Sequence, residues 1–176
     1  MRDALVERAQ HGVPVYFLYD EIGCIKLPES YLEVMRDSGI EVSGFKTTKG
    51  RSNRFQINFR NHRKLLVVDG NIGYIGGNNL GDEYLVYRDT HLKIEGSATQ
   101  HIQFSFVKDW YWATGQLVPT SPEIMACETA DQAVAIVNTG PADEAAKCSI
   151  LFSSLVSSAR SRLWITSPYF VPDDVM

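Results

Sequence analysis

The alternation of apolar and polar positions along the chain predicts alternating helices and strands. Residues 2–11 place their apolar side chains on one helical stripe, and residues 13–19 form a short β-branched and aromatic run typical of a buried strand. The same pair recurs as a helix over residues 28–38 and a strand over residues 40–45. This order indicates an α/β fold whose sheet is at least partly parallel.

Two apolar strands further along flank Asp69-Gly70-Asn71, which is strong turn chemistry for a β-hairpin. Ile102, Phe106 and Trp110 recur with helical spacing and predict a helix over residues 97–114. The remaining expected elements are strands over residues 83–95, 132–138 and 162–166 and a helix over residues 143–159. We therefore expect a mixed, largely parallel sheet flanked by helices.

The composition is that of an ordinary globular protein, with 44% hydrophobic and 22% charged residues. Because no apolar run is long enough to cross a bilayer, we expect this stretch of sequence itself to be soluble. The three cysteines, Cys24, Cys127 and Cys148, lie far apart without metal-ligand spacing. The pattern therefore supports neither a disulfide framework nor a zinc site.

Positive charge is concentrated in one stretch, although the whole chain has a net charge of −4. Seven basic and no acidic residues lie between Glu41 and Asp69, so the rest of the chain carries −11. A solvated loop is the ordinary explanation for such a run. Because this run leads directly into a strand with candidate catalytic residues, we favour a field that attracts phosphate. Arg51 and Arg54 are then candidate ligands of a lipid headgroup.

The candidate chemistry begins with His62 and Lys64, which would share one face of a strand because they are two residues apart. A lysine can hold an anionic oxygen while the histidine attacks, or exchanges a proton with, the atom that bears it. Asp69 falls on the opposite face and is better suited to tying the hairpin. Gly76-Gly77 permits close approach to a ligand, and the Asn79 amide can donate to a phosphate oxygen.

The combined pattern, His-x-Lys-x4-Asp followed by Gly-Gly-x-Asn, resembles the signature of the phospholipase D superfamily. Within it, the chain resembles the bacterial cardiolipin synthases. The matching positions are His62, Lys64, Asp69, Gly76, Gly77 and Asn79. The supporting segments are residues 7–15, 38–42, 94–96, 108–110 and 167–172.

The resemblance implies a phosphatidyltransferase that works without a metal or another cofactor and makes cardiolipin from two phosphatidylglycerols. His62 would form the covalent phosphohistidine intermediate, while Lys64 and Asn79 would hold the non-bridging oxygens. A carboxylate that orients His62 is expected after the asparagine. Asp89 is the first choice and Glu95 the second, and His91, two residues after Asp89, is a minor candidate for the site.

The resemblance also implies a domain organisation, that of a phospholipase D-like α/β/α half. Residues 1–116 would form the first half, with its motif at residues 62–79, and residues 117–176 a connection and the truncated start of a second half. The family uses two such motifs, so we expect a piece of a longer enzyme at a bacterial cell membrane. The second half would come from the same chain or from a homodimer.

Two departures keep alternatives open. Only one motif is present in this sequence, and position 77 is Gly where many relatives carry Ser. One alternative is a phosphodiesterase of the phospholipase D type that cleaves lipid or nucleic acid as a homodimer. Another is an inactive remnant that binds headgroups. The acidic charge outside the basic stretch argues against a nucleic-acid partner, and we expect little turnover from this chain alone.

Overall fold

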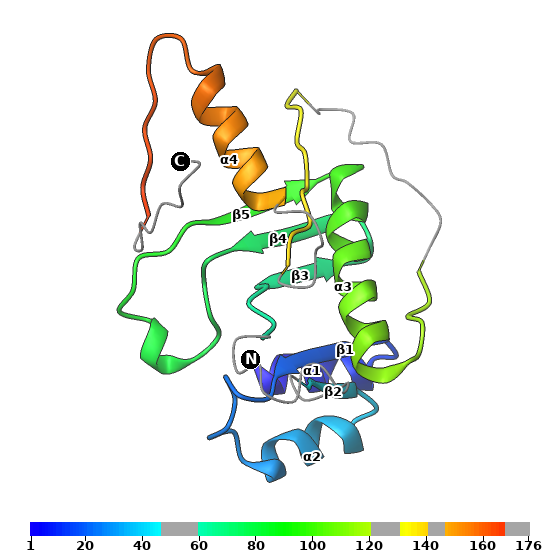
Figure 1. The fold of residues 1–176 in the computed structure, drawn as a ribbon. Helices are drawn as coiled ribbons and strands as arrows, with labels where there is room; N and C mark the ends of the chain where they lie inside the picture. Colours follow the sequence, from blue (N-terminus) through cyan, green and yellow to red (C-terminus); the bar gives the residue numbers. More distant parts are fainter. Residues whose placement is uncertain (47–59, 121–130, 141–146, 168–176) are drawn as a thin grey trace. The chain divides into compact units, whose positions relative to one another are not determined.

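The computed structural model describes residues 1–46, 60–120, 131–140 and 147–167 and divides into two compact units, Met1–Ile136 and Val137–Met176 (Figure 1). None of the helices in these described stretches combines the length and apolar character needed to span a membrane. The described candidates for the site all lie in the first unit.

A two-stranded parallel sheet opens this unit. Strand β1 (Tyr16–Asp20) pairs with β2 (Glu41–Phe45), and helices α1 (Arg2–Gln10) and α2 (Glu29–Asp37) precede the two strands. This arrangement confirms the helix–strand alternation expected from the sequence. Its apolar core includes Leu32, Met35, Ile40 and Phe45.

A three-stranded antiparallel sheet follows, made of β3 (Leu65–Val68), β4 (Ile72–Gly76) and β5 (His91–Glu95) in that order. The turn between β3 and β4 has φ values of +52° at Asp69 and +70° at Gly70. Two left-handed residues match the twist of a tight hairpin. The predicted hairpin is therefore confirmed.

The mixed α/β class is confirmed, but the expected predominance of parallel pairing is not. Among the described strands, only β1 and β2 pair in parallel. For β3 and β4 the physical reason is the length of the connection, because a turn as short as residues 69–71 can join only antiparallel neighbours. The α2 crossover between β1 and β2, in contrast, gives the chain room to return in parallel.

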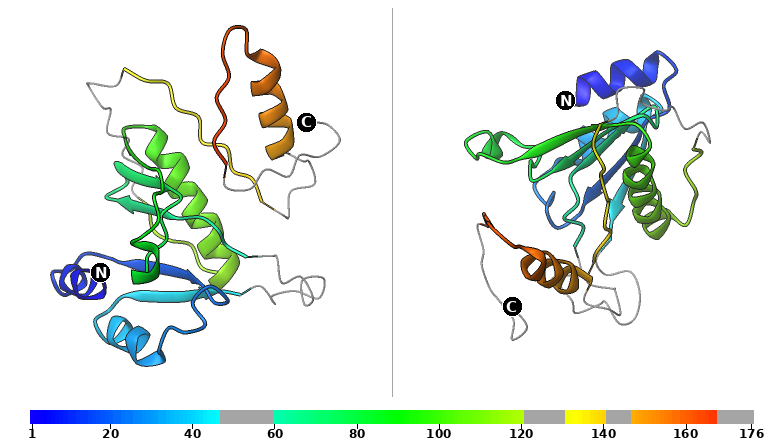
Figure 2. Two further views of the ribbon diagram at one scale, coloured as in Figure 1. Left: turned by 90° about the vertical axis from the view of Figure 1, so that its left-hand side faces the viewer. Right: turned by 90° about the horizontal axis from the view of Figure 1, so that it is seen from above.

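Helix α3 (Ala98–Thr114) joins the two sheets, lying beside both of them in Figures 1 and 2. At one end, the Trp110 ring meets the Tyr16 ring edge to face, with centroids 5.3 Å apart. At the other end, Ile102 is fully buried and stands so close to Gly73 of β4 that a Cβ atom there would lie 2.7 Å from Ile102 Cδ1. The apolar spacing predicted for this helix thus packs against two sheets.

Several expected elements differ from the structure. The strand expected over residues 83–95 is confined to β5, because a 3-10 turn, Asp82–Tyr84, begins the preceding segment. Residues 132–138 and 162–166 form no strand and belong to neither sheet among the described residues. Within the expected helix over 143–159, the described part forms α4 (Lys147–Ser158) in the second unit.

Candidate active site

The segment that carries His62 and Lys64 runs into the start of β3. His62 is exposed to solvent, and the Lys64 ammonium donates a hydrogen bond from Nζ to the His62 carbonyl oxygen at 2.8 Å. The Gly76 amide donates to the Lys64 carbonyl oxygen at 3.3 Å, which extends the β3–β4 ladder by one residue. The two candidate residues therefore lie at the edge of the sheet, just before the strand on which we expected them.

A row of three residues crosses the sheet at this end. Lys64 lies opposite Gly76 of β4, and Gly76 pairs with His91 of β5. Residues directly opposite each other in an antiparallel sheet project to the same face. Gly73, three positions before Gly76, packs against α3, so the row projects to the face that α3 leaves uncovered.

Gly76 has no room for a side chain. A Cβ atom there would lie 2.3 Å from the Thr90 carbonyl oxygen and 2.8 Å from His91 Nδ1. Because the Thr90 carbonyl oxygen is a backbone atom, it cannot rotate away to make room for a side chain. The absence of a side chain at this position lets β5 and the His91 ring approach the strand.

Gly77 has a different neighbour, since a Cβ atom there would lie 2.5 Å from Asp89 Oδ1. The Gly77 amide also donates to the Thr90 carbonyl oxygen at 3.0 Å. The departure from serine at this position thus coincides with a carboxylate packed over the glycine. The contact also places Asp89 at the Lys64 end of the sheet, while its role as an orienting carboxylate stays a prediction.

The electrostatics of Lys64 connect it to the same carboxylate. Partial burial lowers the pKa of the Lys64 ammonium, while the attraction of Asp89 raises it, and burial is the larger effect. Arg60 lowers the pKa further. A lysine that is poorly hydrated and surrounded by charge is prepared to bind an anion, because the anion replaces the water it has lost.

Two candidates lie at the other end of the hairpin. Asp69 follows the last residue of β3, whereas Lys64 precedes the first, so about 16 Å of strand separates them. Glu95 pairs with Ile72, beside that turn, and forms an exposed ion pair with Lys93. Between the two candidate carboxylates, the geometry therefore favours Asp89 over Glu95.

Of the three remaining candidates, the structure describes only Asn79. Asn79 lies in the exposed loop after β4, two residues beyond Gly77, and no hydrogen bond joins it to His62 or Lys64 among the described residues. Arg51 and Arg54 lie outside the described residues.

His91 is a stronger candidate in the structure than in the sequence. Its Nδ1 atom is buried and has no hydrogen-bond partner in the described parts of the chain. A buried unpaired nitrogen costs free energy unless a ligand or water meets it. The sequence signal for this residue was only its position two residues after Asp89; its register opposite Gly76 could not be read from spacing.

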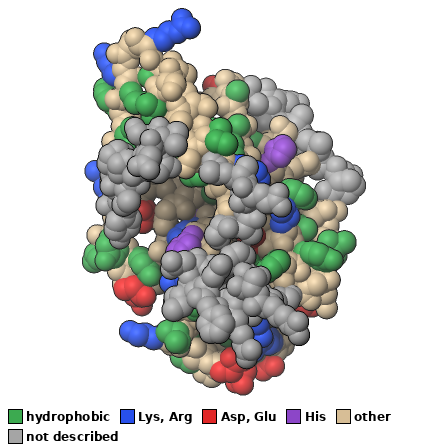
Figure 3. Space-filling model, viewed as in Figure 1, with side chains coloured by type: hydrophobic (Ala, Val, Ile, Leu, Met, Phe, Trp, Pro, Cys, Tyr) green, Lys and Arg blue, Asp and Glu red, His purple; other side chains and the backbone are tan. Residues whose placement is uncertain are grey.

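The face that α3 leaves uncovered carries Lys64 and His91, and Asp89 lies close enough to attract the Lys64 ammonium. Within the described segments, no three His, Cys, Asp or Glu side chains gather as metal ligands. Figure 3 shows scattered hydrophobic side chains, with histidine and basic side chains visible among them.

Comparison with known proteins identifies relatives along the whole chain. No family model matches the chain. Cardiolipin synthase A of Pseudomonas aeruginosa (strain LESB58) is 45% identical over 189 residues, which include 100% of this chain and 37% of the relative. Cardiolipin synthase A of Pseudomonas putida (strain GB-1) is 46% identical over 185 residues, with 100% and 38% covered.

The resemblance to the cardiolipin synthases is therefore confirmed along the whole chain. The chain is a homologue of cardiolipin synthase A, a transferase of phospholipid biosynthesis. It spans little more than a third of the length of the curated relatives it matches.

Proposed function

We propose that this chain supplies the nucleophile-bearing half of a cardiolipin synthase active site. The observation that carries the proposal is the placement of Lys64, whose ammonium contacts the backbone of His62 and is attracted by Asp89. A cation held beside an exposed histidine suits attack on a phosphodiester, which is anionic and repels other nucleophiles. The homology along the whole chain supports phospholipid as the substrate.

The proposed reaction has two displacements at one phosphorus. A ring nitrogen of His62 bonds to the phosphorus of phosphatidylglycerol as the bond to the glycerol oxygen breaks, and that oxygen leaves with a proton from a general acid. The hydroxyl of a second phosphatidylglycerol then loses its proton, bonds to the phosphorus and releases the histidine. Two phosphatidylglycerols thereby become one cardiolipin and one glycerol.

The other residues have proposed roles that the resemblance to the cardiolipin synthases supports. Lys64 and Asn79 hold the non-bridging oxygens, and Asp89 orients His62. Gly76 and Gly77 permit the close approach of strand and carboxylate described above. Asp69 belongs to the hairpin turn, and Arg51 and Arg54 contact the headgroup.

The general acid belongs, in this proposal, to a second His-Lys-Asp half provided in cis or by a homodimer. Residues 1–116 would then form one phospholipase D-like α/β/α half. Because both substrates are membrane lipids, we place the complete enzyme at the bacterial cell membrane. The chain alone would have little turnover.

The test is a graft in which this chain replaces the matching segment of the Pseudomonas aeruginosa relative, hereafter the grafted enzyme. The grafted enzyme is purified, its folding is checked by circular dichroism and cooperative melting, and it is mixed with vesicles of radiolabelled phosphatidylglycerol. We expect labelled cardiolipin and free glycerol. In the His62→Ala variant, both products and the acid-labile phosphohistidine disappear.

Other products would separate the alternatives. Phosphatidic acid in place of cardiolipin would support a hydrolase and contradict the transferase. A folded graft that binds the vesicles but forms no product would support a headgroup-binding remnant. Cleavage of single-stranded DNA at a rate exceeding that on lipid would contradict the proposed substrate.

A further inference from the structure

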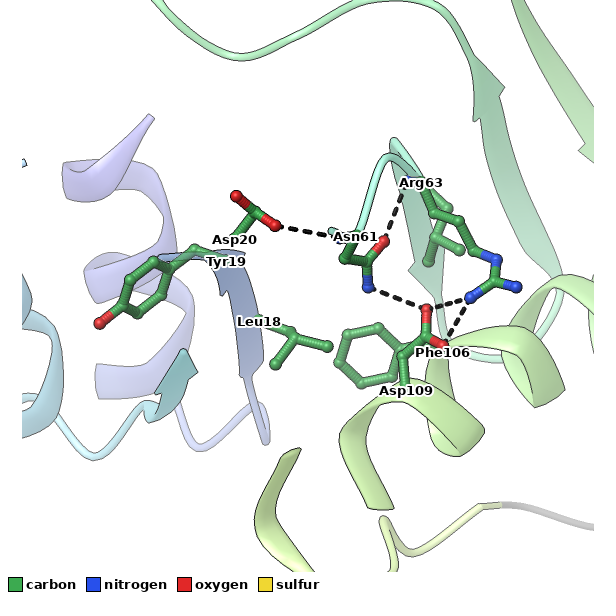
Figure 4. Close-up of a pocket in the computed structure, with 8 residues that line it drawn as sticks. Leu18, Tyr19, Asp20, Asn61, Arg63, Phe106 and Asp109 are labelled. Atoms are coloured by element: carbon green, nitrogen blue, oxygen red, sulfur yellow. Dashed lines mark hydrogen bonds and ion pairs between the residues drawn. The ribbon is translucent and has the colours of Figure 1, made fainter. Parts of the chain in front are cut away.

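Two aspartates from distant elements hold the segment that leads to His62 (Figure 4). Asp20 ends β1, and its Oδ2 atom accepts a hydrogen bond from the Asn61 amide at 3.0 Å. Its Oδ1 atom accepts from Arg60 Nε and Nη2, each at 3.2 Å, and from the Gly23 amide at 2.6 Å. The backbone immediately before His62 is thus anchored to the parallel sheet.

The second aspartate, Asp109, lies on α3 and bonds the residue before His62 and the residue after it. Its Oδ2 atom accepts from Asn61 Nδ2 at 3.0 Å, and Arg63 Nη1 donates to both of its oxygens, at 2.6 and 2.7 Å. Asn61 Oδ1 accepts in turn from the Arg63 amide at 2.9 Å, which closes a loop of bonds around His62. Residues 61 and 63 are therefore both tied to the helix.

These carboxylates are sheltered from water, which makes their bonds strong. The Asp20 and Asp109 side chains are only 11% and 13% exposed, whereas their arginine partners are about one-third exposed. A hydrogen bond to an ionised group in such surroundings is shorter and stronger than a neutral one. The histidine between them, in contrast, is exposed.

A small pocket of about 70 Å³ lies among the same groups. Leu18, Tyr19, Leu65 and Phe106 complete its lining together with Asp20, Asn61, Arg63 and Asp109. Ligand sites usually enclose a few hundred Å³ or more, so this pocket does not hold a phospholipid headgroup. The two carboxylates bind the protein's own backbone and arginines.

We propose that Asp20 and Asp109 are positioning residues that hold the His62 backbone from both sides. They keep the imidazole aligned with the phosphorus through both displacements, and this inference rests on the proposed function. A misplacement of about 1 Å in a reacting group can slow a reaction on the order of 100-fold. Neither aspartate touches the substrate.

The experiment compares Asp109→Asn and Asp20→Asn with Glu29→Gln, which removes the charge of an exposed ion pair on α2. In the grafted enzyme, we expect each site variant to lower kcat by between about 10-fold and 100-fold with KM within about 2-fold. Glu29→Gln leaves both unchanged. Below the melting temperature, a merely structural role would leave kcat unchanged.

A second measurement does not depend on lipid chemistry. The ring signal of His62 is recorded by NMR in this chain and assigned by its loss in His62→Gln. We expect one sharp signal in the parent chain and a broadened or displaced signal in Asp109→Asn. If the grafted enzyme makes no cardiolipin but the His62 signal still responds, the proposed function fails and the positioning role stands.

A variant that does not fold is replaced by Asn61→Ser, which removes the side-chain amide that donates to Asp109 and accepts from the Arg63 backbone amide. The backbone bond to Asp20 and both arginine ion pairs remain. The same loss of kcat and the same change in the His62 signal are expected. The positioning role is overturned if folded variants keep both the parent kcat and the parent His62 signal.

Discussion

The two segments that form the candidate site are held very differently. The approach to His62, residues 60–64, is bound by sheltered carboxylates from β1 and α3. The loop from Gly77 to Thr90 carries Asn79 and Asp89 and is exposed along its whole length. Within this loop, Leu85 and Val86 are 81% and 86% exposed. The proposed nucleophile therefore lies on a segment held by tertiary contacts, whereas Asn79 and Asp89 lie on a loop with little packing.

The difference between the two segments indicates that the rigidity of the candidate site comes from tertiary contacts. A nucleophile needs a fixed direction of attack, and tertiary contacts supply it. A loop that carries phosphate ligands can adjust as the substrate enters, because few contacts oppose its movement. Substitutions in residues 60–64 and in the loop from Gly77 to Thr90 test this difference.

The largest effect is expected at the nucleophile itself. His62→Ala in the grafted enzyme should lower the rate by on the order of 10³-fold or more, because the covalent step has no other nucleophile. Cardiolipin formation and phosphohistidine are measured together. His101→Ala, an exposed histidine on α3, is the control and should retain the parent rate. Labelling that persists in His62→Ala would show that another residue attacks.

Lys64→Met should cost about 100-fold in rate, because a cation that stabilises the developing charge is lost. Lys93→Met, on the same face of the sheet, is the matched control and should have little effect. Since the Lys64 pKa is lowered from 10.5, phosphate binding should weaken with rising pH at lower pH than for an ordinary lysine. The affinity of this chain for inorganic phosphate, titrated by NMR between about pH 8 and 11, checks the direction. An affinity that holds up to pH 10.5 would contradict the role of Lys64.

The lowered pKa of Lys64 also makes the free energy of unfolding depend on pH. A depressed folded-state pKa means that the folded chain disfavours the charged lysine. This penalty is fully present below the folded pKa and fades as pH rises towards the unfolded value. The stability of the parent chain relative to Lys64→Met should therefore increase over that range, as measured by urea unfolding. A difference that does not change with pH would contradict it.

Gly76→Ala should lower the free energy of unfolding by about 2–3 kcal/mol, because the new methyl group meets backbone that cannot move aside. Gly77→Ala is the matched control, since its methyl group meets only the movable end of Asp89. Urea unfolding of both variants measures the difference. Equal losses in the two variants would show that the close approach at Gly76 is unimportant.

The substitution at Gly77 should affect the catalytic rate more than the stability. Gly77→Ala should lower the rate of the grafted enzyme by about 10-fold while costing less than about 1 kcal/mol of stability, because Asp89 must turn away. Asp89→Asn should give a similar loss of rate. The orienting role of Asp89 would be wrong if either variant kept the parent rate.

The smallest effect is expected on the loop. Leu85→Ser with Val86→Ser should change the free energy of unfolding by less than about 0.5 kcal/mol, because both side chains already lie in water. Asn61→Ser, on the anchored segment, should cost more than this double variant. Urea unfolding measures both. The reverse order would break the contrast between the two segments.

Local patterns predicted those parts of the fold that depend on neighbours in sequence. Helix α2, the β3–β4 hairpin and the apolar stripe of α3 follow from spacing and turn chemistry. The strands expected over residues 132–138 and 162–166 are wrong. An apolar run becomes a strand only when a neighbouring strand pairs with it, and neither run takes part in a strand pair among the described residues.

The candidate site divides in the same way. His62, Lys64 and the two glycines were found from their spacing, and Asp89 was expected but lacked a contact until the fold placed it over Gly77. Asp20 and Asp109 were not found as supports of His62. Their bonds to Asn61 span 41 and 48 residues, and no local pattern marks such a pair.

Spacing within one hairpin marks His62, Lys64 and the two glycines as candidates and predicts the turn between their strands. The contact of Asp89 with Gly77, the close approach at Gly76 and the bonds from Asp20 and Asp109 to residues 60–63 arise only in the folded chain. The physical reason is that these facts depend on contacts between β1, the second sheet and α3. Such contacts form only when distant segments pack around one core.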